Sequence, residues 1–190
     1  MKLLEQKIMA EGKVYPGDVL KVSSFLNHKL DVDFLCQVGE EFYQLFKDCD
    51  VNKILTIEAS GIGVACLTAH FFHCPVLFAK KAKTTNLSDN VYSAKAHSYT
   101  HNTDSIIRVD KDYLAASDRV LILDDFLANG AALTALIELC NQAGATVVGC
   151  GAVIEKVYQN GGNRLRAKGI RVESLARIAS MSPEDGIKFC

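Results

Sequence analysis

Short apolar runs, rich in branched side chains and separated by polar stretches, recur through most of this chain. Runs of this length and composition are typical of strands that are buried on both faces of a parallel sheet. Five such runs predict five strands. The expected strands cover residues 53–57, 75–79, 120–123, 146–154 and 172–178.

Apolar residues at helical spacing predict helices before and between these strands. In the clearest case, Phe34, Val38 and Phe42 fall on one face of a helix. Gly12 and Gly144 stand just after two of the expected helices, where glycine commonly ends a helix. The expected helices cover residues 1–11, 34–46, 64–72 and 133–140.

Strands that alternate with helices predict an α/β fold, with a mostly parallel twisted sheet and helices on both of its faces. In such folds, ligands bind at the carboxyl ends of the strands. The chain has 190 residues, with no internal repeat and no linker-like segment. We therefore expect a single domain that spans residues 1–190.

One polar stretch, residues 80–105, breaks this alternation. It is rich in Ser, Thr, Asn, Lys and Tyr, and it lacks helical periodicity. A long segment without clear structure inside a compact domain often forms a lid or a binding loop. We expect this stretch to close over a substrate, and an ordinary exposed hairpin is the alternative. Earlier in the chain, Pro16-Gly17-Asp18 predicts a turn.

The charge balance argues against a nucleic-acid partner, and the short apolar runs argue against a membrane partner. The chain carries 21 basic and 22 acidic residues, whereas a surface that binds a nucleic-acid duplex usually shows a clear basic excess. The clearest basic cluster, Lys80, Lys81 and Lys83, suits one small anionic molecule. No apolar run approaches the roughly 20 residues that a membrane-spanning helix needs.

The cysteines and the first residues indicate the compartment. Seven cysteines are scattered without a C-x-x-C pair, which argues against a disulfide framework and favours a reducing compartment. Charges are spread through residues 1–7, so that this segment does not resemble a signal peptide. We expect a cytoplasmic protein.

The most informative segment runs from the strand at 120–123 through Asp124 and Asp125 to Gly130. Backbone N–H groups and the positive end of a helix dipole can bind a phosphate where a glycine-containing loop opens a helix. The two carboxylates could accept hydrogen bonds from hydroxyl groups, so that together these features suit a sugar phosphate. The alternative is a strand-to-helix turn that binds no ligand.

Two further strand ends carry candidate chemistry. The turn Glu58-Ala59-Ser60-Gly61 opens a helix after the strand at 53–57, although a simple turn explains it equally well. Lys156 directly follows another apolar strand, where it could also be an ordinary exposed residue. A lysine ammonium only donates hydrogen bonds, so that a ligand beside Lys156 would have to present an acceptor atom to it.

The apolar strand, the acid pair, the small residues and Gly130 together resemble the sugar-phosphate signature of type I phosphoribosyltransferases. The resemblance implies the fold of that family, with a small hood from the N-terminal segment and a flexible active-site loop. It implies that Asp124 and Asp125 hold the ribose hydroxyls and form the catalytic pair. It assigns the 5-phosphate to Ala128, Asn129, Gly130, Ala131 and Ala132, and the diphosphate to Glu58, Ala59, Ser60, Gly61, Lys80 and Lys81.

Longer segments narrow the resemblance. Residues 19–28, 126–130 and 171–178 are similar to the xanthine-specific members of the family, whose version of the loop includes the asparagine at position 129. The resemblance implies purine salvage, in which xanthine and 5-phosphoribosyl 1-diphosphate give xanthosine 5′-monophosphate and diphosphate. It further implies a homodimer, and Mg²⁺ that is bound with the sugar diphosphate and has no direct protein ligand. The xanthine contacts that it implies come from Leu20, Asn27 and Lys156.

Two alternatives stay open. The enzyme could act on hypoxanthine and guanine or on adenine, because the residues alone do not choose the base. A non-catalytic regulator could use the same fold to sense the sugar diphosphate, but the chain has neither spare length nor a basic helix for a DNA-binding module.

Overall fold

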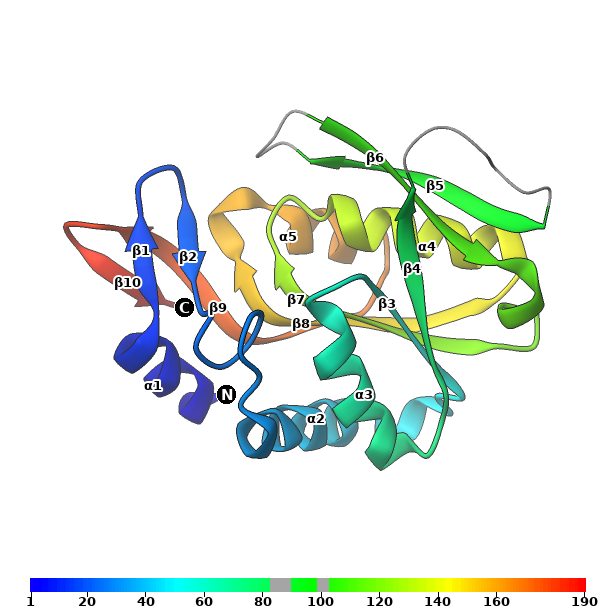
Figure 1. Ribbon diagram of the computed structural model, residues 1–190, viewed down its shortest axis with the longest axis horizontal. Coiled ribbons are helices and arrows are strands. Elements are labelled where there is room, and N and C mark those ends of the chain that lie inside the picture. Colours follow the sequence, from blue (N-terminus) through cyan, green and yellow to red (C-terminus); the bar gives the residue numbers. More distant parts are fainter. Residues whose placement is uncertain (83–89, 99–102) are drawn as a thin grey trace.

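The computed structural model describes residues 1–82, 90–98 and 103–190. Over these residues, one sheet has the strand order β10-β9-β8-β7-β3-β4-β6-β5 (Figure 1). Adjacent strands from β9 to β4 run parallel, while β10 at one edge and β6 and β5 at the other pair antiparallel. The mostly parallel sheet is therefore confirmed. The strands are β3 (Lys53–Ile57), β4 (Val76–Ala82), β5 (Val91–Ser98), β6 (Thr103–Asp110), β7 (Arg119–Leu127), β8 (Thr146–Lys156), β9 (Val172–Ser182) and β10 (Gly186–Phe189).

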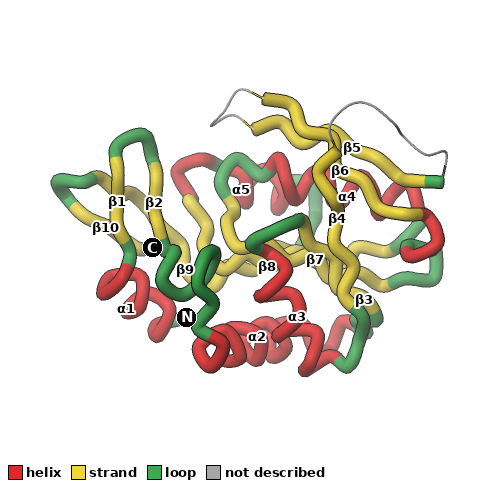
Figure 2. Tube along the Cα trace, viewed as in Figure 1, coloured by secondary structure: helices red, strands yellow, loops and turns green. Residues whose placement is uncertain are grey.

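Helices cover both faces of this sheet (Figure 2). One apolar cluster joins α1, α2 and α3 to one face, and a second joins α4 and α5 to the other. Within the described part of the chain, no helix is both long and apolar enough to cross a membrane. The helices are α1 (Lys2–Glu11), α2 (Val32–Phe46), α3 (Gly61–Phe72), α4 (Ala131–Ala143) and α5 (Gly161–Ala167), with short 3₁₀ turns η1 (Lys47–Cys49), η2 (Lys111–Tyr113) and η3 (Val157–Gln159).

The central strand β7 shows why its sequence is a continuous apolar run. Leu121 and Leu123 point into the cluster on the α2 and α3 side, whereas Val120 and Ile122 point into the cluster beneath α4. Successive side chains of a strand point to opposite faces. A strand that is covered on both faces therefore needs an apolar residue at each of these positions.

Helix ends follow the predicted signals. The Asp31 carboxylate accepts a hydrogen bond from the backbone N–H of Phe34 at 3.2 Å, and it thereby caps α2. Gly144 ends α4 with a φ of 72°, a left-handed conformation that favours glycine. Both the helix at 34–46 and the terminating glycine at 144 are confirmed.

The N-terminal segment forms a small unit beside the main sheet. Strands β1 (Lys13–Tyr15) and β2 (Val19–Lys21) pair antiparallel across the expected turn, in which Gly17 and Asp18 have positive φ. Figure 1 shows this hairpin next to β9 and β10, near the C-terminus. It forms the hood. Its strands of three residues are too short to give a periodic signal, so that the sequence indicated only the turn.

Strands β7 and β8 extend further than the sequence predicted. The expected ends lay at residues 123 and 154, but the two strands continue to pair through Phe126 with Ile154 and Leu127 with Glu155. Asp124 and Asp125 therefore lie within β7 and not after it, which corrects their predicted position. Polar residues can continue a strand here because neighbouring backbones still supply the ladder hydrogen bonds.

The polar stretch 80–105 also differs from the expectation. Within its described part, β4 continues to Ala82, and β5 pairs with β6 from Val91–Asp110 to Ser98–Thr103. The antiparallel pairing agrees with the hairpin alternative in part, but the pair extends the main sheet beside β4 and packs against α4, so that it is not an ordinary exposed hairpin. The buried side chains of β5 are alanines, Ala94 and Ala96, which give only a weak alternating pattern. Residues 83–89 and 99–102, including Lys83, lie outside the described residues, and a closing lid stays a prediction.

Candidate functional site

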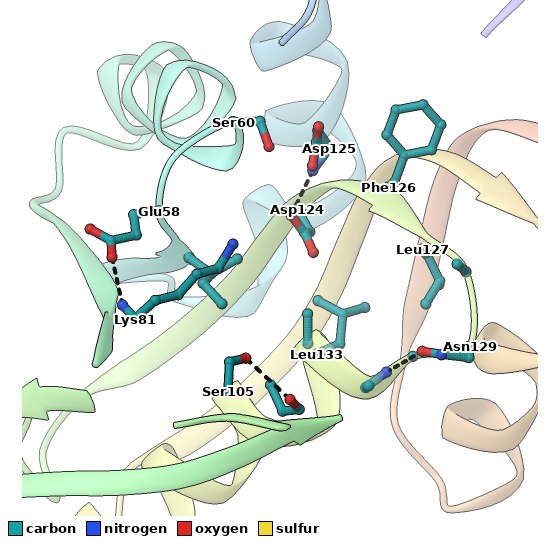
Figure 3. Close-up of a pocket in the computed structure, with 16 residues that line it drawn as sticks. Glu58, Ser60, Lys81, Ser105, Asp124, Asp125, Phe126, Leu127, Asn129 and Leu133 are labelled. Carbon is teal, nitrogen blue, oxygen red and sulfur yellow. Dashed lines mark hydrogen bonds between the residues drawn. The ribbon is translucent and has the colours of Figure 1, made fainter. Parts of the chain in front are cut away.

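A cavity of about 260 Å³ opens at the carboxyl ends of β3 and β7 and at the start of α4 (Figure 3). Asp124, Asp125 and the loop from Ala128 to Ala132 line one part of it, and Glu58, Ser60 and Lys81 line another. Parallel strands place their carboxyl ends along one edge of a sheet, which is why residues from distant parts of the sequence meet here.

The two aspartates are the most deeply buried charged groups of this cavity. Their side chains are 5% and 7% exposed, and an Asp124 carboxylate oxygen accepts a hydrogen bond from the backbone N–H of Asp125 at 2.9 Å. Burial, and then the neighbouring charge of Asp125, raises the pKa of Asp124 well above its usual value, while Lys81 acts in the opposite direction. The pair therefore favours a cation or a hydroxyl donor as its neighbour.

The loop from Ala128 to Ala132 joins β7 to the N-terminus of α4. Gly130 has a φ of 81°, which a residue with a side chain rarely adopts. The side-chain oxygen of Asn129 accepts from the backbone N–H of Ala131 at 2.9 Å, so that Asn129 holds the first turn of the helix. The amide NH₂ group of Asn129 and the positive end of the helix dipole can both bind a phosphate.

The turn that begins at Glu58 lies across the cavity from this loop. The Glu58 carboxylate accepts a hydrogen bond from the backbone N–H of Lys81 at 2.6 Å, which ties the turn to β4. The peptide bond between Glu58 and Ala59 is cis. A Cβ atom at Gly61 would stand only 2.1 Å from Oγ1 of Thr56, so that the start of α3 can lie this close to β3 only with glycine.

The structure separates Lys80 from Lys81. Figure 3 shows the Lys81 side chain extending toward Asp124 from the β4 edge of the cavity. Lys80 points to the opposite face of β4, where its ammonium lies 6.0 Å from the ring of Phe78. Adjacent residues of a strand always diverge in this way. Within one chain, Lys81 is brought to the predicted diphosphate site and Lys80 is not.

A second cavity, of about 560 Å³, adjoins the first beneath the hood. Leu20, Asn27 and Lys156 all line it, although they come from three distant segments. The Lys156 ammonium donates to the backbone oxygen of Asp18 at 2.5 Å. Burial lowers the pKa of Lys156 from its ordinary value.

The two cavities share a wall. Phe126, Ala128 and Asn129 line both of them. The amide nitrogen of Asn27 lies 3.5 Å from a carboxylate oxygen of Asp125, which links the hood to the acid pair. A ligand in one cavity would thus stand directly beside a ligand in the other, as two reacting molecules must.

Comparison with known proteins decides the family. No family model matches the chain. The xanthine phosphoribosyltransferase of Lachnoclostridium phytofermentans is 51% identical over 98% of this chain and 96% of its own. That of Oceanobacillus iheyensis is 52% identical over 96% of this chain and 94% of its own. The chain belongs to the xanthine phosphoribosyltransferase family.

Solved structures of related enzymes support the fold of this xanthine phosphoribosyltransferase family member. The adenine phosphoribosyltransferase of Trypanosoma brucei, in complex with AMP, pyrophosphate and ribose-5-phosphate, is similar with a TM-score of 0.79. It is 18% identical, and the match covers 96% of this chain and 83% of that one. The Giardia lamblia enzyme matches with a TM-score of 0.76, 24% identity, and coverage of 92% and 97%. At these identities the likeness shows the fold alone.

Two features of the candidate site were missed by sequence reasoning. The ring of Phe126 forms part of the wall between the cavities, 5.7 Å from the Lys156 ammonium. Its position between the acid pair and the phosphate loop is a signal that could have found it. Asp18 contributes through its backbone oxygen, and no sequence signal indicates that kind of contact.

Proposed function

We propose that this protein transfers the 5-phosphoribosyl group of 5-phosphoribosyl 1-diphosphate to xanthine. The products are xanthosine 5′-monophosphate and diphosphate, as purine salvage requires. The observation that carries this proposal is the pair of adjoining cavities, one with an acid pair and an anion-binding loop and the other with Lys156 under the hood. The family membership of the chain supports the same reaction.

The sugar phosphate binds in the smaller cavity. The carboxylates of Asp124 and Asp125 accept hydrogen bonds from the ribose 2′- and 3′-hydroxyls. The backbone N–H groups at the start of α4 and the amide of Asn129 bind the 5-phosphate. Ser60, Gly61 and Lys81 surround the diphosphate at C1 of the sugar.

Xanthine binds in the larger cavity. The Lys156 ammonium carries three donors, so that it can keep its bond to the Asp18 oxygen while it donates to the 6-oxo oxygen of the base. The amide of Asn27 supplies a donor for the second oxo group, and Leu20 supplies an apolar surface. A 6-amino group would meet the Lys156 ammonium donor to donor, which disfavours adenine.

The reaction breaks the bond between C1 and the diphosphate oxygen and forms the bond between C1 and N9 of the base, whose N9 proton is released to water. Positive charge develops on the sugar as the diphosphate departs. The Asp125 carboxylate stabilises that charge, and Lys81 with the N–H groups of the loop stabilises the departing anion. Since the two cavities fix both reactants beside each other, positioning supplies much of the remaining acceleration.

Magnesium fits this site as a part of the substrate complex. Burial and the neighbouring charge of Asp125 raise the pKa of Asp124, and a cation carried in by the sugar diphosphate would favour the ionised form of this acid pair. We expect Mg²⁺ to enter with the sugar diphosphate and to have no direct protein ligand. When bound, it neutralises charge on the leaving group.

We further expect a homodimer in the cytoplasm. All seven cysteines lie within the described residues and are free, in accord with a reducing compartment. Light scattering at several protein concentrations tests the dimer.

One assay tests the function. The protein is incubated with Mg²⁺, the sugar diphosphate and, separately, xanthine, guanine, hypoxanthine or adenine, and the nucleotide formed is measured. We expect xanthine to give the highest kcat/KM. A preference for adenine would refute the role of Lys156, and no product with any of the four bases would refute the enzymatic function itself.

A further inference from the structure

The short helix α5 lies against the outer side of the loop that lines the sugar-phosphate cavity. The backbone N–H of Gly161 donates to the oxygen of Ala128 at 3.1 Å. A guanidinium nitrogen of Arg164 donates to the oxygen of Asn129 at 2.5 Å. The packing leaves no room for a side chain, because a Cβ atom at Gly161 would stand 2.3 Å from the Ala128 oxygen. The first turn of α5 thus sets where residues 128–130 can lie.

A buried ion pair holds α5 in this place. Glu155, at the end of β8, is only 1% exposed. Both of its carboxylate oxygens accept hydrogen bonds from Arg166 of α5, at 2.8 and 2.9 Å. Arg166 also donates to the backbone oxygen of Val172 on β9 at 3.2 Å. A Cβ atom at Gly162 would stand 2.0 Å from the Glu155 carboxylate, so that the helix turn lies directly on the ion pair.

The strand end carries different contacts on its two faces. Glu155 and Lys156 are consecutive residues of β8, and their side chains therefore point in opposite directions. Lys156 faces the cavity beneath the hood, and Glu155 faces α5. Burial by itself would raise the pKa of Glu155, but hydrogen bonding to Arg166 and Ser174 and the charges of Arg166 and Arg177 together outweigh it, and the pKa lies below its ordinary value.

We propose that Glu155 and Arg166 are positioning residues for the 5-phosphate loop: their ion pair fixes α5, and the Gly161-Gly162 turn of α5 fixes residues 128–130. The assignment of that loop to the 5-phosphate rests on the proposed function. A bidentate pair fixes both the distance and the angle between two elements, which apolar contact does not. Stability alone does not require an ion pair here, because apolar residues in place of a buried pair are often as stabilising.

Arg177 provides a matched control. Its guanidinium lies 3.5 Å from the same Glu155 carboxylate, but it belongs to β9 and is about half exposed. Arg177→Met therefore removes one positive charge beside Glu155 and leaves the connection to α5 in place. Arg166→Met removes one positive charge and that connection together. Arg166→Lys keeps the charge and loses the two-pronged geometry.

The test separates positioning from stability with the double variant Glu155→Gln/Arg166→Met, which leaves neither charge of the pair. Binding of ribose 5-phosphate is measured by calorimetry, KM is measured for each substrate, and thermal unfolding is followed in parallel. We expect Arg166→Met and the double variant to raise the Kd of ribose 5-phosphate about tenfold, since small displacements of a binding group have large effects. The double variant should regain the melting temperature that Arg166→Met loses. KM for xanthine at saturating sugar diphosphate should stay within about twofold of the parent value in these variants. In Arg177→Met, KM for both substrates and the Kd of ribose 5-phosphate should also stay within about twofold of the parent values.

The proposal is overturned if the double variant binds ribose 5-phosphate as tightly as the parent, or if KM for both substrates rises in parallel. If the double variant does not fold, the Arg166→Lys variant decides. A Kd for ribose 5-phosphate that is higher than that of Arg177→Met supports the proposal, and an equal Kd refutes it. Ribose 5-phosphate binding does not depend on the reaction. A parent protein that binds it but makes no nucleotide would therefore refute the proposed function and still test the positioning role.

Discussion

The two cavities of the site are built in different ways. The cavity proposed for the sugar phosphate is formed by central elements of the sheet and by the N-terminus of α4, and glycines at 61, 130 and 161 allow close contacts around it. The cavity proposed for the base is closed by the N-terminal hood and the segment that follows it, which are tied to the sheet near the site by Lys156 with the Asp18 oxygen and by Asn27 beside Asp125. The first is thus a frame of central elements, and the second is completed by a covering segment whose apolar side chains, such as Val22 and Phe25, pack into the core.

This difference assigns separate tasks to the two regions. Reacting atoms must be held within a fraction of an ångström, and rigid elements do this better than loops. The choice of base depends on a few donors and on an apolar wall, which a covering segment can supply. We therefore expect changes in the frame to affect turnover and changes under the hood to affect the base.

The largest effect should come from Asp125→Asn. The fold should persist, because asparagine has nearly the same shape, but kcat should fall by about 10² to 10³ when a charge that stabilises the transition state is removed. Steady-state kinetics measures the loss of turnover, and circular dichroism measures whether the fold persists. Asp185→Asn, on an exposed turn, is the control. Equal turnover in Asp125→Asn and the parent would remove this carboxylate from the mechanism.

Lys156→Met should affect the other region. The loss of a charged hydrogen bond to the base should lower kcat/KM for xanthine by about 10- to 100-fold. The Kd of ribose 5-phosphate, measured by calorimetry, should change little, because that ligand lies in the frame. A parallel loss of sugar-phosphate affinity would show that the two regions are not separable in this way.

Asp124→Asn should stabilise the fold and impair catalysis. Since the folded state raises the pKa of Asp124, it binds more protons than the unfolded state, and its stability falls as the pH rises through that range. Asparagine avoids this cost and can still accept from the Asp125 N–H.

We expect the melting temperature of Asp124→Asn, measured without ligand near neutral pH, to exceed that of the parent by about 2–4 °C, which corresponds to roughly 1 kcal/mol in a domain of this size. The gain should shrink as the pH is lowered and should vanish below about 3, under the ordinary Asp pKa of about 3.9, where the parent carboxyl is protonated in both states. A variant that melts below the parent at neutral pH would contradict this.

The smallest effect should come from Lys7→Met. Lys7 pairs with Asp31 at 2.9 Å and with Glu11 at 3.0 Å, and it thereby links α1 to the start of α2 beneath the hood. Exposed ion pairs contribute little, and salt screens them. We expect KM for xanthine to change by less than about twofold, and the change to disappear at 1 M salt. A larger effect would mean that the hood is held more rigidly than the contacts near the site indicate.

Much of the frame could be predicted from the sequence because its signals are local. The apolar runs of β3, β7 and β8 and the left-handed glycine at 144 reflect rules that act within a few residues. The strands β5 and β6 and the helix α5 were not predicted, because alanines and a seven-residue helix give weak periodic signals. The roles of the individual site residues stay predictions that the experiments above address.

The placement of Lys80 and Lys81 could be predicted from the sequence only in part. The alternation of a strand requires that the two point apart, so that the sequence alone could have excluded a shared site within one chain. Which of them faces the cavity depends on which face of β4 meets α4, and that is settled by packing.

The sequence by itself determined the α/β class, the order of the central strands and the helices between them, and the acid pair with the glycine-containing loop that follows it, because hydrophobic period and glycine positions are local properties of a chain. Tertiary structure alone decided that Asn27 would stand beside Asp125 and Lys156 beside Asp18, and that Glu155 would meet Arg166 beneath the loop. These contacts join elements through the sheet order and the hood. Their geometry follows from how whole layers pack, and no short window of sequence contains it.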